Sequence, residues 1–410
     1  MLGNNWLFIA ALLLIIGLVT QQLPLILISI LFILVRGMAR LWDRYCLTRI
    51  EYRRRLSSNR VFFGEELLFE VEVANRKPLP LPWIQIDDMV PPEVTLLKGK
   101  TTSSSDTNSV YLRNFFSLNW YHKVKRRYPV RCLQRGYFPF GPTRIRSGDL
   151  FGFFSREIEI KSVDYLMVYP KIVSLEKLGI PSKQPLGDIR TRRNIFEDPI
   201  LTSGIRDYHF GDSLKRIHWK STARLGKIQV KVFEPTTTTD MGIFLDVRTI
   251  KPAFWGGVPE LLELAILATA SISNHAISAG YRVGLFVNQH KRYIDEPIRV
   301  PPSQHAGQLM QILEALAQTH SYETIPITRL VQRECRSLSW GSTVVVISAM
   351  PIESLFSTLV NIKKAGRNVV LIVVGGPEPS ITNNGLTVYH IPEDLNWREL
   401  ETVSLVGAKS

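Results

Sequence analysis

Two strongly apolar runs open the chain, and polar residues mark where each of them ends. Residues 6–20 (WLFIAALLLIIGLVT) carry no charge, and residues 23–35 (LPLILISILFILV) repeat the pattern after a short polar turn. A helix needs roughly 17–25 residues to cross a bilayer. The second run reaches that length when it continues past Arg36, whose long side chain extends back to the interface. We therefore predict a transmembrane helical hairpin over residues 1–40.

Two other interpretations of this region fit less well. A secretory signal would begin with basic residues and end at a small-residue cleavage site, and the sequence shows neither. A single long tilted helix would place Gln21, Gln22 and Pro24 in the middle of the membrane, where polar groups are costly. The hairpin is thus the preferred interpretation.

A basic juxtamembrane segment, residues 41–56, comes next. Arginine close to the end of a span stays on the cytoplasmic side, so we expect an inner (plasma) membrane protein whose N-terminus and soluble domains are cytoplasmic. Three widely spaced cysteines agree with that reducing compartment. Anionic membrane lipid is the expected partner of this basic cluster. The cluster comprises Arg36, Arg40, Arg44, Arg49, Arg53, Arg54 and Arg55.

Short alternating runs broken by Gly and Pro turns then predict a β-sandwich-like domain over residues 57–170. One part of it, between Lys123 and Arg146, is strongly basic and contains no acid. This part is either a solvated outer face beside an anionic bilayer or a nucleic-acid groove with Trp120 and Tyr121 as stacking platforms. We favour the outer face. The juxtamembrane arginines account for a good part of the net charge of +14, and such segments pair with anionic lipid, so nucleic acid is not needed to explain the charge.

The pattern changes in residues 236–410, where apolar strands alternate with amphipathic helices. Such a sequence is typical of an α/β doubly wound domain with helices on both faces of a parallel sheet. Ligands of these folds bind at the carboxyl ends of the strands, here after Asp246, Asn288, Ser348 and Gly375. No glycine-rich phosphate loop is present, so we expect no nucleotide and no other cofactor.

Residues 171–235 form a linker that contains a densely functionalised stretch, RDYHFGDSLKRIHWKSTAR. Asp212 is a plausible N-cap and Gly226 a terminator, which predicts one short helix between them. On that helix Arg216, Lys220 and Arg224 form a basic row, while Ile217 and Trp219 provide apolar contacts to a neighbouring domain.

A catalytic interpretation of the same stretch would use Ser221 as nucleophile, His218 as base and Asp212 as the group that orients it. Helical spacing does not bring these three into that arrangement, and the turn that presents a hydrolase nucleophile is absent. We therefore assign no catalytic residue.

This stretch resembles the signature of the domain-of-unknown-function 58 family, R-x-Y-x-x-G-D-x-x-R-x-I-x-W-x-x-x-A-R. Lys215 stands where the family has arginine, and Asp149–Phe154 resembles the family's D-P-F-G-L-F-like run with leucine in the proline position. The residues that we assign to partner binding or to the structure of the motif are Arg206, Tyr208, Gly211, Asp212, Lys215, Arg216, Ile217, Trp219, Lys220, Ala223 and Arg224.

The resemblance implies a bacterial membrane protein with a von Willebrand factor A-like domain. A metal-ion-dependent adhesion site in such a domain has the pattern D-x-S-x-S after the first strand. Here Asp246 is followed by Arg248 and Ile250 in the two serine positions. We expect a degenerate site without metal, in which the guanidinium of Arg248 occupies the place of the cation.

The resemblance also implies partners, namely a MoxR-type AAA+ ATPase and a transglutaminase-like membrane protein. The sequence as a whole therefore predicts a membrane-anchored, non-enzymatic adaptor or scaffold that binds proteins. The alternatives are a membrane-associated hydrolase and a basic surface that binds nucleic acid or anionic lipid. Nucleic acid is the least favoured of these ligands.

Overall fold

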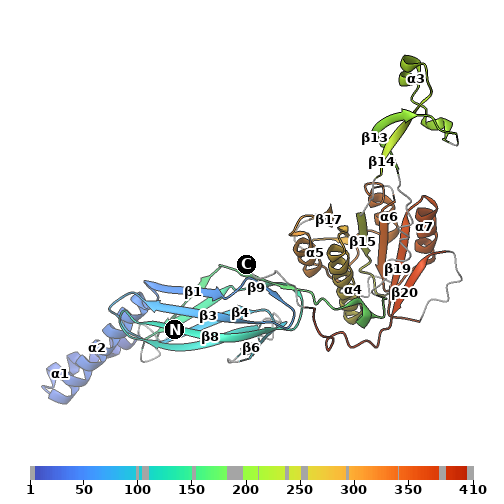
Figure 1. The fold of residues 1–410 in the computed structure, drawn as a ribbon. Helices are drawn as coiled ribbons and strands as arrows, with labels where there is room; N and C mark the ends of the chain where they lie inside the picture. Colours follow the sequence, from blue (N-terminus) through green and yellow to red (C-terminus); the bar gives the residue numbers. More distant parts are fainter. Residues whose placement is uncertain are drawn as a thin grey trace. The chain divides into compact units, whose positions relative to one another are not determined.

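The computed structural model describes residues 5–97, 101–103, 110–149, 154–181, 197–210, 212–235, 240–250, 257–291, 295–339, 341–377 and 385–403. The chain divides into two compact units, Met1–Tyr169 and Pro170–Ser410 (Figure 1). The first unit combines two N-terminal helices with β-sheets, and the second contains an α/β sheet.

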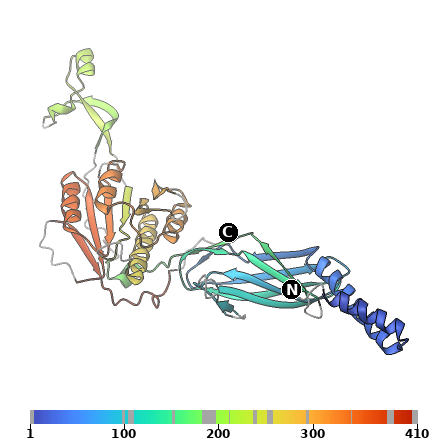
Figure 2. The same cartoon turned by 180° about the vertical axis from the view of Figure 1, so that it is seen from behind.

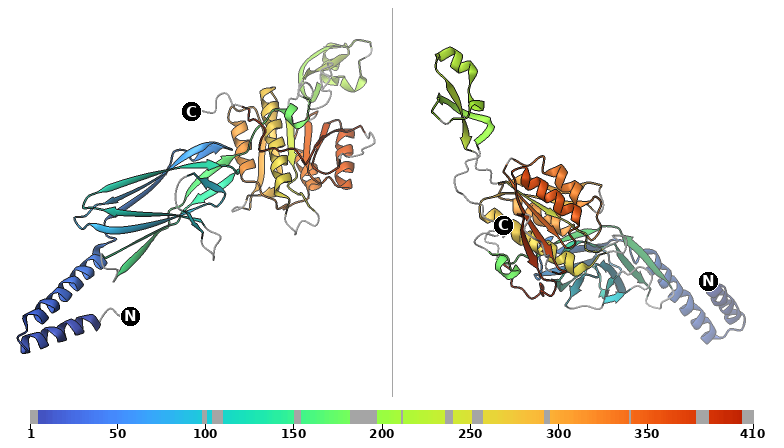
Figure 3. Two further views of the ribbon diagram at one scale, coloured as in Figure 1. Left: turned by 90° about the horizontal axis from the view of Figure 1, so that it is seen from below. Right: turned by 90° about the vertical axis from the view of Figure 1, so that its right-hand side faces the viewer.

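The two N-terminal helices, α1 (Asn5–Val19) and α2 (Leu23–Tyr45), lie side by side (Figure 3). A Cβ on Gly17 would lie 3.1 Å from Ile26, so the glycine permits the close approach of the two helices. Of the described helices, α2 and α4 (Pro259–Ser278) are long and apolar enough to cross a membrane, and the apolar part of α1 is shorter. Most of α4 is buried inside the second unit, which marks it as a core helix.

The basic segment after the hairpin belongs to two regular elements. Its first part continues α2, and its second part is strand β1 (Ile50–Leu56). Trp42 fixes the end of α2 to the sheets by donating a hydrogen bond from Nε1 to the carbonyl of Pro80 at 3.0 Å. Arg156 adds an ion pair with Asp43, 3.0 Å between Nε and Oδ1.

The strands of the first unit form β-sandwich-like sheets (Figure 2). Alternate residues of β3 and β7 point into an apolar core that contains Phe69, Val71 and Leu112. The sheet orders are β1-β3-β8-β5, β11-β10-β4-β7-β6 and β2-β12-β9. The strands not yet bounded are β2 (Arg60–Phe62), β3 (Glu66–Asn75), β4 (Leu81–Val90), β5 (Val94–Leu96), β6 (Thr101–Ser103), β7 (Val110–Leu118), β8 (Lys123–Cys132), β9 (Gly136–Phe140), β10 (Thr143–Gly148), β11 (Ser155–Ile160) and β12 (Asp164–Tyr169).

The basic stretch from Lys123 to Arg146 is largely neutralised by acids on neighbouring strands. Arg127 Nε lies 2.8 Å from an oxygen of Glu70 on β3, and Arg146 Nε lies 2.6 Å from an oxygen of Glu157 on β11. Lys123 and Lys125 both contact Glu72, and these contacts lower the pKa of that carboxyl to about 2. These acids lie outside the basic stretch in the sequence, so the sequence alone does not reveal that the charges are paired. The arrangement favours a solvated outer face over a nucleic-acid groove.

The second unit is built on a six-stranded sheet of order β17-β16-β15-β18-β19-β20 (Figure 1). All neighbouring pairs are parallel except β16 and β17, so the predicted parallel sheet is confirmed with one antiparallel edge strand added. Helices α4 and α5 pack together on the sheet, and α6 and α7 form a second pair with their own apolar cluster. The bounds are β15 (Asp240–Leu245), β16 (Arg282–His290), β17 (Pro297–Ser303), β18 (Thr343–Ser348), β19 (Asn368–Val374), β20 (Thr387–Ile391), α5 (Gln308–Ala317), α6 (Ile327–Glu334), α7 (Glu353–Lys364) and the 3₁₀ helix η1 (Leu175–Leu178).

The signature stretch lies between two strands, β13 (Glu197–Asp207) and β14 (Gln229–Pro235), which form a separate antiparallel sheet. A 3₁₀ helix, η2 (Leu214–Arg216), and a short α-helix, α3 (Trp219–Leu225), connect them. We call residues 204–232 the motif module.

Candidate functional site: an exposed motif and a buried polar cluster

The motif module contains two short helices where the sequence predicted one. The α-helix begins at Trp219, and His218 is its N-cap because the imidazole Nδ1 accepts a hydrogen bond from the Ser221 amide at 3.1 Å. Ile217 causes the interruption. It is extended, forms a β-bridge with Val230 and is only 7% exposed. Gly226 ends the helix with φ +64°, as predicted.

Asp212 therefore has a different role from the predicted helix cap. Both carboxylate oxygens lie 2.7 Å from the guanidinium of Arg206, and Oδ2 also accepts a hydrogen bond from the His209 amide at 2.9 Å. The Arg206 contact is the main reason why the pKa of Asp212 is lowered to about 2. The pair joins the end of β13 to the loop that follows it. Gly211, the preceding signature residue, lies outside the described residues.

Trp219 lies on the surface, which corrects the expectation that its ring packs against a neighbouring domain. Its side chain is 71% exposed, because the buried position of this turn is taken by Ile217 two residues earlier. Other large apolar side chains of the module are exposed as well. They are Ile205, Phe210, Leu214, Leu225 and Ile228.

Basic residues of the motif module are exposed as well. Lys215, Lys220, Ala223 and Arg224 are all exposed, and Tyr208 is partly buried while its amide bonds to the carbonyl of Ile228 at 3.0 Å. The predicted row is broken, since Arg216 lies on η2 and only Lys220 and Arg224 share α3. We call the exposed residues Phe210, Leu214, Trp219 and Leu225, together with the exposed Lys215, Lys220 and Arg224, the docking patch. Exposed aromatic and cationic residues together are the composition of protein-binding hot spots.

The catalytic arrangement of Ser221, His218 and Asp212 is not formed in the described structure. His218 bonds to the backbone amide of Ser221 and not to its hydroxyl, and Asp212 bonds to Arg206. A nucleophile needs a hydrogen-bonded base that a third group orients. In these contacts the imidazole of His218 does not bond to the Ser221 hydroxyl, and the carboxylate of Asp212 does not orient the imidazole.

A second group of polar residues lies at the carboxyl ends of the central strands of the α/β sheet. Asp246 follows β15 and is completely buried. Its Oδ1 accepts hydrogen bonds from Asn288 Nδ2 at 2.8 Å and from the Arg248 amide at 3.2 Å, and its Oδ2 accepts one from the Ser348 hydroxyl at 2.8 Å. Burial raises its pKa, which these hydrogen bonds only partly offset. The structure thus brings together three of the four residues named at the strand ends, Asp246, Asn288 and Ser348, whereas the Gly375 amide bonds to the carbonyl of Ile391.

Arg248 lies near Asp246 but forms its ion pair elsewhere. Its Nη1 is 3.9 Å from Glu323, a residue between α5 and α6 that the sequence did not indicate. Asn288 Nδ2 is 3.5 Å from the same glutamate and so links both carboxylates. Among the described residues no group of three or more His, Cys, Asp or Glu side chains could hold a metal ion. Ile250, the second lost serine position, is partly exposed.

Comparisons with known proteins find similarity to a protein that is itself uncharacterized. The uncharacterized protein YeaD of Bacillus subtilis is 22% identical over 312 residues, which are 74% of this chain and 70% of that protein. Two solved structures match 29% of this chain. The CARDB domain of a Pyrococcus furiosus protein is 11% identical, is covered over 89% of its own length and has a TM-score of 0.19. A non-cellulosomal cohesin from Archaeoglobus fulgidus is 9% identical, is covered over 91% of its length and has a TM-score of 0.21, and scores this low support no inference. The motif module and the α/β sheet fall together in residues 204–405, the region that matches the family described as protein of unknown function DUF58.

Proposed function

We propose that this chain is a membrane-anchored, non-enzymatic adaptor that binds a protein partner through the docking patch. The observation that carries the proposal is the exposure of Phe210, Leu214 and Trp219 on a small module. Between the two helices of this module, Ile217 is buried. Exposing large apolar side chains to water is unfavourable by about 25 cal/mol per Å². A partner that covers them recovers this free energy.

The anchor in this proposal is the pair α1 and α2. Helix α2 has the length and the apolar composition of a span, most of its apolar side chains are exposed, and arginines follow it. Positive residues beside a span favour the cytoplasmic side. We accordingly place the hairpin in the inner membrane and both soluble parts in the cytoplasm.

The charge of the docking patch indicates the chemistry of the partner. Asp212 is paired with Arg206, whereas Lys215, Lys220 and Arg224 point to solvent. An acidic surface with an apolar depression is therefore the best complement. The resemblance of the signature to the domain-of-unknown-function 58 family points to a MoxR-type AAA+ ATPase as that partner, with a transglutaminase-like membrane protein nearby.

For the α/β sheet we propose a von Willebrand factor A-like domain with a degenerate metal site. The strand order with one antiparallel edge strand supports this, as does the position of Asp246 after the central strand. Its carboxylate is already bonded to an amide side chain, a hydroxyl and a backbone N–H. Metal-dependent adhesion is therefore not part of the proposed function.

The test is affinity purification of the full chain from membranes, followed by mass spectrometry. The double variant Phe210→Ala/Trp219→Ala should lose a specific protein that the unaltered chain retains. Tyr322→Ala is the matched control, since Tyr322 is also an exposed aromatic residue of the second unit. An unchanged set of bound proteins in the double variant would refute the docking patch.

The hydrolase alternative is tested by His218→Ala. In the adaptor account this variant retains its partner, because His218 only caps a short helix. A variant that folds and binds normally but loses all biological activity would favour the hydrolase instead.

A further inference from the structure

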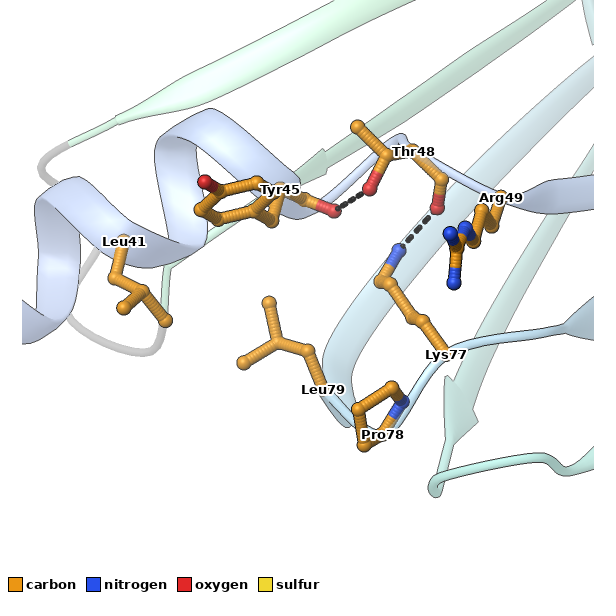
Figure 4. A pocket seen from close by; sticks show the side chains of 7 residues that line it. All are labelled: Leu41, Tyr45, Thr48, Arg49, Lys77, Pro78 and Leu79. Carbon is orange, nitrogen blue, oxygen red and sulfur yellow. Dashed lines mark hydrogen bonds between the residues drawn. The ribbon is translucent and has the colours of Figure 1, made fainter.

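We propose that the first unit contains a binding site for the phosphate group of an anionic phospholipid, in the pocket between the end of α2 and the β3–β4 turn. This inference rests on the proposed membrane anchor and adds to it a defined site. The pocket has a volume of about 580 Å³ (Figure 4). Its walls include Lys77 and Arg49 on one side and Leu41, Tyr45 and Leu79 on the other.

Lys77 is the residue that points to an anionic ligand. It is only 4% exposed, and its ammonium donates hydrogen bonds to the carbonyls of Cys46 and Thr48, the latter at 2.8 Å. Within the described part of the chain no carboxylate pairs with it. A buried ammonium group has three donors and normally has a counter-ion. In Lys77 two of the three N–H groups bond to carbonyls, so one N–H remains to bind a ligand, and no counter-ion among the described residues neutralises the ammonium. Burial lowers the pKa of Lys77 to about 8.

Arg49 supplies a second positive group at the same pocket. It precedes β1 with φ +50°, a backbone conformation that is uncommon for a residue with a side chain. Among the described residues its guanidinium has no hydrogen-bonded or ion-paired partner. A guanidinium beside an ammonium is a favourable setting for a phosphate group.

The pocket begins at the headgroup layer and extends away from the bilayer. Leu41 follows Arg36 by five residues, or about 7.5 Å of helix, which is the edge of a headgroup layer roughly 5–8 Å thick on each side. Cys46, whose carbonyl accepts a hydrogen bond from Lys77, follows Arg36 by ten residues, or about 15 Å of helix. Leu41 and Leu79 offer an apolar wall to the glycerol and the first acyl carbons. This apolar wall distinguishes a lipid phosphate, which carries a glycerol and acyl chains, from a free phosphate ion.

Aromatic side chains at the neighbouring turn support the same placement. Trp120 and Tyr121 are both largely exposed at the β7–β8 turn, and the Tyr121 amide donates to the carbonyl of Lys77 at 3.3 Å. Tryptophan and tyrosine gather at the membrane–water interface. The two residues considered as stacking platforms for nucleic acid are thus explained as interfacial anchors beside the pocket.

The test uses the full chain in nanodiscs of phosphatidylcholine with a minor fraction of phosphatidylglycerol. Native mass spectrometry after release should find phosphatidylglycerol retained by the unaltered chain and by Lys77→Arg. Retention should fall about 10-fold, or 1.4 kcal/mol, in Lys77→Met. Arg53→Met is the control, because Arg53 is a juxtamembrane arginine outside the pocket. Equal retention by Lys77→Met and the unaltered chain would overturn the site.

A pH series on the unaltered chain tests the site without relying on a variant that has lost the ammonium. Retention should fall as the pH rises through about 8 and above, since the ammonium loses its proton there, and Lys77→Arg should abolish this dependence. The other titratable or charged groups at Lys77 are the guanidinium of Arg49, the phenol of Tyr45 and the thiol of Cys46, whose pKa burial raises. Retention that is independent of pH would contradict the site.

Two arms separate the possible failures. Binding of inorganic phosphate alone as tightly as phosphatidylglycerol would refute a lipid ligand. Extraction of the chain from membranes by alkaline carbonate would refute the membrane anchor, and with it the proposed function. A chain that stays in the bilayer but retains no phosphatidylglycerol refutes only the pocket.

Discussion

Asp212 in the motif module and Asp246 in the α/β sheet have the same side chain in opposite environments. Asp212 is near the surface, where Arg206 lowers its pKa to about 2. Asp246 is completely buried, and burial raises its pKa. The module pairs Asp212 with Arg206 and exposes apolar and basic side chains, whereas the sheet buries Asp246 and satisfies its carboxylate with Asn288, Ser348 and a backbone amide. The first arrangement suits a surface that binds a partner, and the second suits a rigid framework.

The largest predicted effect concerns the framework. Asp246→Ala leaves the Asn288 amide and the Ser348 hydroxyl buried without their acceptor. The loss should be on the order of 3 kcal/mol, since each unsatisfied buried group costs about 1–3 kcal/mol. Hydrogen exchange of β15 in the full chain measures it. Asp212→Ala is the control and should leave β15 unchanged. A loss below about 0.5 kcal/mol in Asp246→Ala would contradict the structural role.

The second prediction separates folding from binding inside the module. Ile217→Ala removes a buried side chain and should destabilise the module by about 2 kcal/mol or more. Trp219→Ala removes an exposed ring and should change stability by less than about 0.5 kcal/mol. The sequence predicts that Trp219 packs against a neighbouring domain, which would make its loss costly, and the exposure of the ring removes that reason. Thermal unfolding followed by exchange of β14 distinguishes the two. Equal destabilisation by both variants would show that the ring is covered.

The third prediction uses acid to distinguish the two aspartates. The folded pKa of Asp212 is about 2 against a usual 3.8, so its contribution to stability is present above pH 3.8 and is lost as the pH falls towards 2. The pH dependence of the Asp246 contribution has the opposite sign. Burial raises its folded pKa, so lowering the pH protonates a carboxylate whose charged form is unfavourable in the folded state, and stability is gained rather than lost. The module should therefore open before the sheet on acidification.

Exchange rates of β13 and β15 measured over this pH range follow the two transitions. Arg206→Met should raise the pKa of Asp212 and shift the opening of the module to higher pH, with no effect on β15. Opening of β15 before β13 would contradict the assignment of the two environments.

The smallest predicted effect is on metal binding. The Asp246 oxygens already accept three hydrogen bonds, and Arg248 and Ile250 offer no hydroxyl. Calorimetry on the full chain with Mg²⁺ or Mn²⁺ should therefore show no saturable heat. Saturable binding that Asp246→Ala abolishes would show that the polar cluster rearranges around a cation.

Much of the second unit was predictable, because its strands are apolar runs of the right length and its helices are amphipathic. Strand β17 is harder to predict, since Pro301 and Pro302 make its sequence unlike that of a strand. A proline is tolerated only at an edge strand such as β17. The convergence of Asp246, Asn288 and Ser348 followed from the rule for strand ends. Glu323 did not, because it lies in a loop without periodicity.

The motif module shows what local sequence leaves undecided. Residues 212–226 have the composition of one helix, but the bridge between Ile217 and Val230 interrupts it, and β14 is needed to form that bridge. The pairing of Arg127 with Glu70 and the isolation of Lys77 likewise depend on which strands become neighbours. Sequence named the residues of the motif as a group, and the structure places them in the motif module. Which of them face the solvent is decided by tertiary contacts.

The central claim is that the docking patch binds a protein at the membrane, and one affinity measurement tests it most directly. The full chain in nanodiscs is titrated with a purified MoxR-type AAA+ ATPase from the same organism. The account predicts saturable binding that Trp219→Ala weakens about 30-fold, or about 2 kcal/mol, that Lys220→Glu also weakens, and that Tyr322→Ala leaves unchanged. Binding that is equal in the unaltered chain, Trp219→Ala and Lys220→Glu, or no binding at all, would contradict the claim.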